Sequence, residues 1–148
     1  MNFVIVRDDR EKQGWEFAAY PNEVTVQRME TGDYTIAGYE DVFAIERKSI
    51  PDLVHTTTWG RERFVDELER GKDLLHFVVV VEGYPEGVER YINKSGRKCH
   101  PNAVLGSVRS WEQNHNTEFM WCGSASSAEY QAYHKLQSWY GTAHLNFF

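Results

Sequence analysis

A run of five apolar residues, Phe77 to Val81, constrains the fold of this chain more than any other segment. Side chains of a β-strand alternate between the two faces of a sheet, so a strand that is apolar at every position must be covered on both faces. Such strands usually lie inside a sheet that has helices on each side. The run therefore predicts an α/β domain.

The segments around this run extend the same pattern, because short apolar or alternating runs predict strands and longer periodic segments predict helices. The expected strands lie at residues 3–8, around Val24 and Val26, after a turn at 31–33, and at 42–47, 77–81 and 119–121. The expected helices lie at residues 49–55, 61–75, 101–114 and 127–140. This order predicts one α/β domain over residues 1–148, with a mixed central sheet flanked by helices.

Composition narrows the class of protein. The 148 residues suit one domain, and a hydrophobic fraction of 41% indicates a folded chain. No apolar run approaches the roughly 20 residues that span a bilayer, and the N-terminus lacks the basic region of a signal peptide. Cys99 and Cys122 have no metal-ligand spacing and are expected to be free thiols in a reducing compartment. We therefore expect a cytoplasmic, intracellular protein that does not bind a membrane.

Two residues at the end of the strand 42–47 point to chemistry. Glu46 and Lys48 are two positions apart, so the strand period places both side chains on one face and Arg47 on the other. Asp33 enters from the expected neighbouring strand. Carboxylates that hold a hard divalent cation, beside a lysine that steadies a phosphate, suffice for metal-assisted phosphodiester hydrolysis. The spacing favours a nuclease that uses Mg2+ or Mn2+.

Each of these residues also has a structural interpretation. An aspartate after a glycine is commonly a turn residue, and a Glu46–Lys48 surface ion pair would contribute less than about 1 kcal/mol. Asp8 ends the first buried strand, where sites of α/β sheets commonly lie, but it also suits a simple strand end. Ser49 and Asp52 have the spacing of a helix capping box. The combination of Asp33, Glu46 and Lys48 favours the functional interpretation.

Four segments, in order, resemble the nuclease domain of the XPF/Hef structure-selective endonucleases, a branch of the restriction-endonuclease-like superfamily. They are Val6-Arg7-Asp8-Asp9-Arg10-Glu11, Gly32-Asp33 followed by Glu46-Arg47-Lys48-x-x-x-Asp52, Gly60-Arg61, and Val79-Val80-Val81-Glu82-Gly83. The resemblance covers residues 3–83 by motif and the remainder by its helix-strand-helix pattern. The Gly-Asp and Glu-Arg-Lys pieces are the specific ones. No helix-hairpin-helix module, which such proteins use to hold DNA, is found in this sequence.

The resemblance implies a restriction-endonuclease-like fold and a Mg2+- or Mn2+-dependent endonuclease that cleaves branched, flap or fork DNA, in DNA repair or recombination. It assigns metal binding to Asp8, Glu11, Asp33 and Glu46, and catalysis to Asp33, Glu46 and Lys48. It assigns support of the site to Arg10, Arg47 and Asp52, and DNA contacts to Arg61 and Arg63.

The net charge of the chain leaves other functions open. The net charge of −6 opposes tight non-specific DNA binding by this chain alone, although bound cations and local basic patches offset part of it. A catalytically silent module that binds a junction or a partner subunit, and a junction resolvase or RNA nuclease of related fold, are the rival functions. The DNA-binding partner is either a separate subunit or a second copy of the chain, paired through its aromatic C-terminal third.

Other chemistries find no motif in the sequence. It contains no HExxH pair, zinc-type spacing, nucleophile elbow or phosphate-binding P-loop. The aromatic residues of 127–140 have helical spacing, which favours a core or subunit face over a binding cage. Trp59 is open to two interpretations: packing in the core, the default for tryptophan, or stacking on a splayed base.

Overall fold

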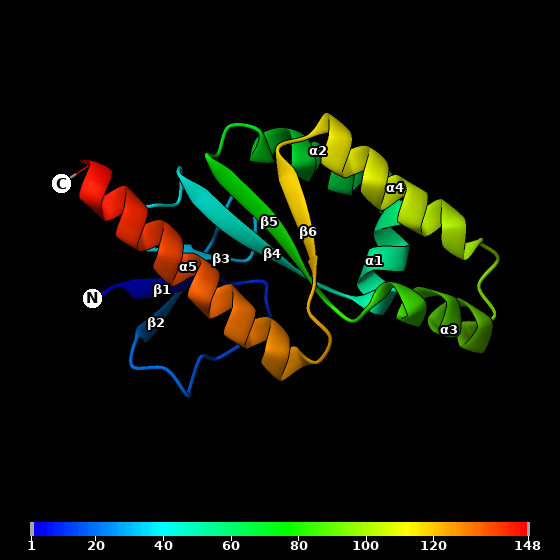
Figure 1. Ribbon diagram of the computed structural model, residues 1–148, viewed down its shortest axis with the longest axis horizontal. Coiled ribbons are helices and arrows are strands. Elements are labelled where there is room, and N and C mark those ends of the chain that lie inside the picture. The colour runs from blue at the N-terminus through cyan, green and yellow to red at the C-terminus, as the bar shows by residue number, and fades with distance from the viewer. Residues whose placement is uncertain (1, 148) are drawn as a thin grey trace.

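The computed structural model describes residues 2–147 (Figure 1), with side chains described as far as His144. Six strands form one mixed sheet in the order β2-β1-β3-β4-β5-β6. The strands are β1 (Val4–Asp8), β2 (Glu23–Gln27), β3 (Tyr34–Ile36), β4 (Phe43–Ser49), β5 (His76–Glu82) and β6 (Thr117–Trp121). The helices are α1 (Ile50–Thr57), α2 (Arg61–Gly71), α3 (Pro85–Ser95), α4 (Pro101–Asn114) and α5 (Ala125–Phe147).

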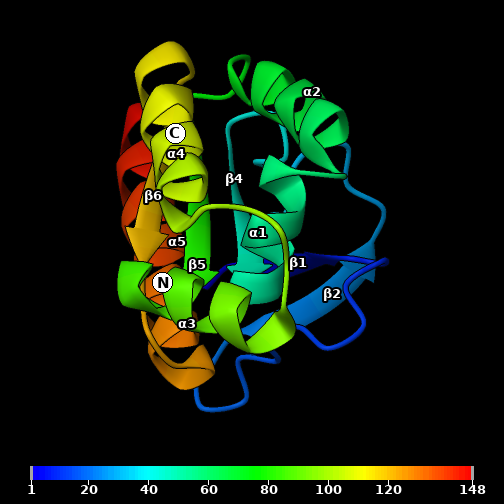
Figure 2. The same ribbon diagram turned by 90° about the vertical axis from the view of Figure 1, so that its right-hand side faces the viewer.

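Strand β5 is buried on both faces, as its apolar run predicts. It pairs in parallel with β4 on one side and β6 on the other. Val78 and Val80 pack in a core beneath α5, whereas Val79 and Val81 pack in a second core beneath α1, α2, α3 and α4. Figures 1 and 2 show α5 on one side of the sheet and α1 and α2 on the other. The predicted α/β class, with a mixed sheet between helices, is confirmed.

Two helices differ from the sequence prediction. The helix expected over 61–75 ends at Gly71. Gly71 packs so closely on the Phe77 ring that a Cβ there would lie 2.4 Å from it, which favours glycine at this position. Helix α3 was not predicted, although Pro85 at its start and Gly96, with a φ of 70°, just after its end are the usual boundary signals. The first difference concerns the end of a helix, whereas the second is a whole helix whose local boundary signals are present in the sequence.

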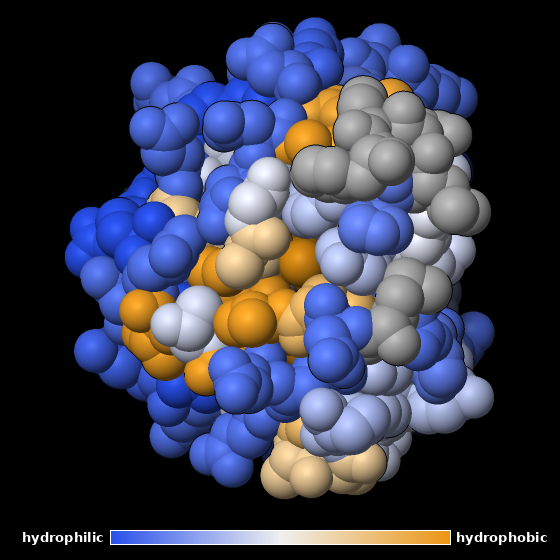
Figure 3. Space-filling view, turned by 90° about the vertical axis from the view of Figure 1, so that its left-hand side faces the viewer, coloured by the Kyte–Doolittle hydropathy of each residue, from blue (hydrophilic) through white to orange (hydrophobic). Residues whose placement is uncertain are grey.

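The aromatic C-terminal helix belongs mainly to the core. Tyr133 and Trp139 are buried against the sheet, whereas Tyr130 is exposed. Near the end of α5, an apolar hollow opens at the surface, on the face drawn in Figure 3. Its apolar lining includes Phe3, Val4, Ile36, Tyr39, Val42 and Tyr140. Within the described part of the chain, none of the helices has the combined length and apolarity needed to cross a membrane.

Candidate active site

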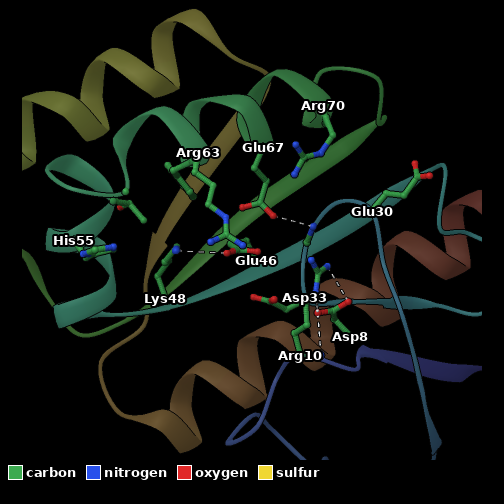
Figure 4. A pocket seen from close by; sticks show the side chains of 14 residues that line it. Asp8, Arg10, Glu30, Asp33, Glu46, Lys48, His55, Arg63, Glu67 and Arg70 are labelled. Atoms are coloured by element: carbon green, nitrogen blue, oxygen red, sulfur yellow. Dashed lines mark hydrogen bonds and ion pairs between the residues drawn. The ribbon is translucent and has the colours of Figure 1, made fainter.

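A pocket between the sheet and helices α1 and α2 contains the residues singled out by the Glu-Arg-Lys motif (Figure 4). Glu46 and Lys48 both line this pocket from β4, and their Oε2 and Nζ atoms lie 3.6 Å apart. The side chain of Arg47 turns to the opposite face of the sheet, where it contacts Glu82. The strand alternation thus places each of the three side chains as the sequence spacing predicts.

The Gly-Asp pair forms a tight turn that fixes Asp33 at the pocket wall. Gly32 has a φ of 81°, and a Cβ there would lie 2.8 Å from the Cβ of Ala44, so only glycine fits. The Asp33 amide donates to the carbonyl of Ile45 at 2.7 Å. In return, the Arg47 amide donates to Oδ2 of Asp33 at 2.8 Å. These two bonds hold the aspartate against β4, one residue from Glu46.

The carboxyl groups of Asp33 and Glu46 form a pair that lacks enough positive charge. Glu46 is only 7% exposed, and its Oε1 atom has no hydrogen-bond partner among the described residues. Burial, with the charge of Glu11, raises the pKa of Asp33 to about 7. Burial and the neighbouring Asp33 raise the pKa of Glu46 well above its usual value. At least one proton is therefore retained by the pair until a cation replaces it.

Lys48 provides the positive charge closest to this pair. Its ammonium lies over the Phe64 ring, 4.9 Å from the ring centroid, in addition to its contact with Glu46. The side chain is thus fixed between β4 and α2. A fixed ammonium at the mouth of a carboxylate pair can contact an anion that enters the pocket.

The residues of the pocket fit a divalent metal ion such as Mg2+. Mg2+ is commonly bound through one or two carboxylates, with water and substrate phosphates completing its shell. Asp33 and Glu46 provide two such groups, and the unpartnered Oε1 of Glu46 is an available ligand atom. Over residues 2–144, three or more His, Cys, Asp or Glu side chains are nowhere grouped closely enough to form a metal site by themselves. The fit is that of a two-carboxylate site.

Asp8 lines the same pocket but is bound to an arginine. Arg10 donates to its two carboxylate oxygens, at 2.8 Å from Nε to Oδ2 and 3.1 Å from Nη2 to Oδ1. The amide of Met29 also donates to Oδ1 at 2.8 Å. Burial acts to raise the pKa of Asp8, but the bonds from Arg10 and Met29 outweigh it and the pKa is lowered. Asp8 is therefore already ionised and neutralised by its neighbours.

Glu11 lies apart from the pocket, with Arg47 on the other face of β4. Nη1 of Arg47 is 3.5 Å from a Glu11 oxygen, and Nη2 is 2.8 Å from Glu82. Trp15 donates to Glu82 from its indole at 3.1 Å. Three of the four acids expected to converge therefore line one pocket, Asp8, Asp33 and Glu46, although Asp8 is bound to Arg10, whereas Glu11 pairs with Arg47. Glu11 does not line the pocket, although its charge still raises the pKa of Asp33.

Of the three remaining predicted residues, one lines the pocket and two make contacts elsewhere. The amide of Asp52 donates to the Ser49 hydroxyl at 3.2 Å, so the capping interpretation describes this contact. Arg63 lines the pocket from α2. Arg61 instead packs on α4, where it donates to Ser107 at 2.8 Å and lies 5.1 Å from the Trp111 ring centroid.

Helix α2 brings further charged residues to the pocket that were not predicted. Glu67 accepts a hydrogen bond from the Gly32 amide at 3.2 Å and so supports the turn that carries Asp33. Arg70 lines the same wall. Arg63, Glu67 and Arg70 are spaced i, i+4 and i+7, the period of one helix face. This spacing, next to the Gly60-Arg61 motif, could have predicted from the sequence that the three residues share one face of the helix.

Comparison with known proteins places this site in a family context. Residues 7–133 match the ERCC4 domain. The structure of XPF from Aeropyrum pernix is similar, with a TM-score of 0.67 and 15% identity over 98% of this chain and 62% of that one. XPF from Aeropyrum pernix in complex with DNA gives a TM-score of 0.58 and 17% identity over 88% and 66%. The chain thus spans less than two thirds of both XPF chains. A search of curated protein sequences gave no match.

Proposed function

The chain belongs to the ERCC4 domain family, and on that premise we propose that it is a metal-dependent DNA endonuclease with its active site in the pocket between β4 and α2. One observation carries the proposal: a buried glutamate, Glu46, whose Oε1 atom has no partner beside a second carboxyl group and a fixed lysine. Such a group is costly in a purely structural role, because burial without a partner is unfavourable. A cation bound beside Glu46 would offset this unfavourable burial.

Asp33 and Glu46 are proposed to hold the metal, Mg2+ or Mn2+. When bound, the ion supplies Lewis-acid chemistry: it polarises a phosphoryl oxygen and lowers the pKa of a water molecule. Asp33 is oriented for this by the Arg47 amide. Asp8 and Glu11 receive no ligand role, since each is paired with an arginine.

Lys48 is proposed to stabilise the negative charge that develops on the scissile phosphate. Its Nζ atom is fixed by Glu46 and by the Phe64 ring, so little reorganisation is needed when the phosphate arrives. Arg63 and Arg70 line the α2 side of the pocket and suit contacts to neighbouring phosphates. The pocket therefore combines the Asp33–Glu46 pair with three cations, Lys48 from β4 and Arg63 and Arg70 from α2.

The proposed substrate is DNA with a branch, flap or fork. The resemblance to structure-selective endonucleases supports this, as does the similarity to an XPF that was solved with DNA. The net charge of −6 disfavours tight binding to plain duplex. Shape recognition through phosphate contacts fits a chain with no evident recognition helix.

Cleavage assays with titrated Mg2+ test the proposal on flap, fork and plain duplex DNA of the same sequence. We expect Mg2+-dependent cleavage of the branched substrates by the wild type and its loss in Lys48→Ala and Glu46→Gln. Lys135→Ala on α5 and Glu23→Gln on β2 are matched controls, because they make the same chemical changes away from the pocket. Inactivity of the wild type and Lys48→Ala alike on every substrate would refute enzymatic activity.

Calorimetry with Mg2+ separates the enzyme from a catalytically silent module. Binding that is lost in Glu46→Gln and retained in Glu23→Gln supports the two-carboxylate site. If Mg2+ does not bind at all, the pocket has no metal role and the silent module is the better description.

Further DNA affinity is proposed to come from a second copy of this chain or from a separate DNA-binding subunit. The apolar hollow beside Phe3 and Tyr140 is the surface offered to a second copy. Light scattering over a concentration series distinguishes the two: a dimer mass supports the second copy, and a monomer mass supports a separate subunit.

A further inference from the structure

We propose that Trp59 is a base-stacking residue, which binds an unpaired base of the DNA next to the candidate active site. This inference rests on the proposed function for the identity of the substrate as DNA. The part of that DNA recognised by Trp59 is a base that is not paired within a duplex.

The indole of Trp59 is unusually exposed. Its exposed fraction is 88%, which makes the core-packing interpretation wrong for this residue. The other four tryptophans are buried or half-buried: Trp15, Trp111, Trp121 and Trp139. An indole offers a large flat apolar surface that contributes strongly when it is covered. The exposed indole of Trp59 is therefore available for a stacked base to cover.

The backbone holds Trp59 in this exposed position. The carbonyl of His55 accepts hydrogen bonds from the amides on both sides of the tryptophan, at 3.1 Å from Thr58 and 2.9 Å from Gly60. Gly60 also lies against the His55 ring, since a Cβ there would come within 2.9 Å of it. The turn between α1 and α2 is therefore closed on His55, and Trp59 within it is exposed to solvent.

The surroundings of Trp59 are positively charged. The hollow beside it is lined by His55 and Thr58 on one side and by Arg97, Lys98 and Cys99 on the other. Two cations and no carboxylate thus face this hollow, in a chain whose net charge is −6. An aromatic platform beside cations is the arrangement that binds single strands, because bases stack while phosphates meet the positive charges.

The hollow adjoins the candidate active site. His55 lines both, and Gly60, the residue after Trp59, lines the active-site pocket. Figure 4 shows His55 at the edge of the pocket that holds Glu46 and Lys48. A strand with a base on Trp59 would therefore pass over His55 toward the carboxylate pair. Duplex DNA keeps its bases stacked inside, so this contact selects DNA that has a single-stranded part.

Tryptophan fluorescence of the metal-free protein tests the inference without any cleavage. A short oligothymidine is titrated into the wild type, and an abasic oligonucleotide of the same length serves as the probe that has phosphates but no bases. We expect a saturable quench with oligothymidine and none with the abasic strand, because Trp59 is the one strongly exposed tryptophan among residues 2–144. Plain duplex is expected to quench little.

Variants complete the test. In fluorescence anisotropy with a labelled oligothymidine, Trp59→Ala is expected to bind roughly tenfold or more weakly, and Trp59→Phe to retain most of the affinity. Arg97→Ala and Lys98→Ala should weaken binding of oligothymidine and abasic strand alike.

No quench by oligothymidine, or an equal quench by the abasic strand, overturns the inference, and the first result would point to a protein as the ligand of this surface. Failure of this inference can be told apart from failure of the nuclease proposal. A base-dependent quench without cleavage supports base stacking on Trp59 and contradicts nuclease activity. Cleavage without a quench supports nuclease activity and contradicts base stacking on Trp59.

Discussion

Two groups of acids lie on opposite faces of β4, and their partners differ. On the α2 side, Asp33 and Glu46 face each other with one lysine nearby. On the α5 side, Glu11 and Glu82 share the guanidinium of Arg47 between them. The glutamates of both groups are largely shielded from water. Each group keeps one buried carboxylate oxygen without a hydrogen-bond partner, Oε1 of Glu46 and Oε2 of Glu11, but of the two only Glu46 lines the active-site pocket.

The difference shows how neighbouring charges separate structure from chemistry. A guanidinium fork between two carboxylates satisfies their charge and binds the segments together. Two carboxyl groups without such a fork repel each other when ionised, so they retain a proton or bind a cation. The sequence motifs of the family include residues of both groups and do not distinguish them. The contacts that each group makes in the folded chain decide which group is proposed to bind metal.

The largest expected effect comes from replacing one acid in each group. Glu46→Gln should lower the cleavage rate roughly a thousandfold, the scale for losing a key electrostatic group, while stabilising the metal-free protein by relieving repulsion. Glu82→Gln should leave the rate within a few-fold but reduce stability. Steady-state cleavage and urea unfolding of both variants measure this. A similar loss of rate in both would remove the distinction between the two groups.

The next effect concerns the arginine that joins Glu11 to Glu82. Arg47→Met leaves two largely buried carboxylates without their cation, and we expect a loss of about 3 kcal/mol in unfolding free energy. The backbone amide that orients Asp33 remains, so calorimetry should still detect Mg2+ binding to the folded fraction. Loss of Mg2+ binding in a folded variant would show that the two faces are coupled.

The raised pKa of Asp33 predicts a pH dependence of stability. Folded Asp33 titrates at about 7 and unfolded aspartate near 3.8, so between these values the folded state binds more protons. Stability of the metal-free protein should therefore fall as pH rises through this window, by on the order of 2–4 kcal/mol at about 1.4 kcal/mol per pKa unit. Glu46, and Glu11 more weakly, add to the same trend.

Thermal unfolding across this pH window measures the trend. Asp33→Asn should flatten it, and saturating Mg2+ should remove it within the same pH window, because the ion replaces the retained proton. Stability that rises with pH in the metal-free wild type would contradict the assignment of a strained carboxyl pair.

The smallest expected effect separates two arginines on one helix. Arg63→Ala, in the pocket, should slow cleavage about tenfold through a lost phosphate contact. Arg61→Ala should leave cleavage unchanged and cost about 1 kcal/mol of stability, since its partners are Ser107 and the Trp111 ring. Cleavage rates and urea unfolding of the pair decide this, and reversed effects would assign the DNA contact to Arg61.

The sequence alone determined the features that depend on local period. The apolar run at 77–81 predicted an interior strand, and the two-residue spacing of Glu46 and Lys48 predicted that they share a face. The Gly-Asp pair predicted a turn, which the φ of Gly32 explains. These inferences hold because alternation and turn geometry involve residues close together in the chain.

The tertiary structure decided what each charged side chain meets. Glu11 pairs with Arg47 on the far face of the sheet, Glu67 reaches Gly32 from another helix, and Trp59 stays in solvent. None of these follows from spacing, because the partners are distant in sequence and their side-chain directions depend on how helices pack on the sheet. Neutralisation and burial are properties of contacts, and for that reason the different partners of the four predicted acids could be read only from the folded chain.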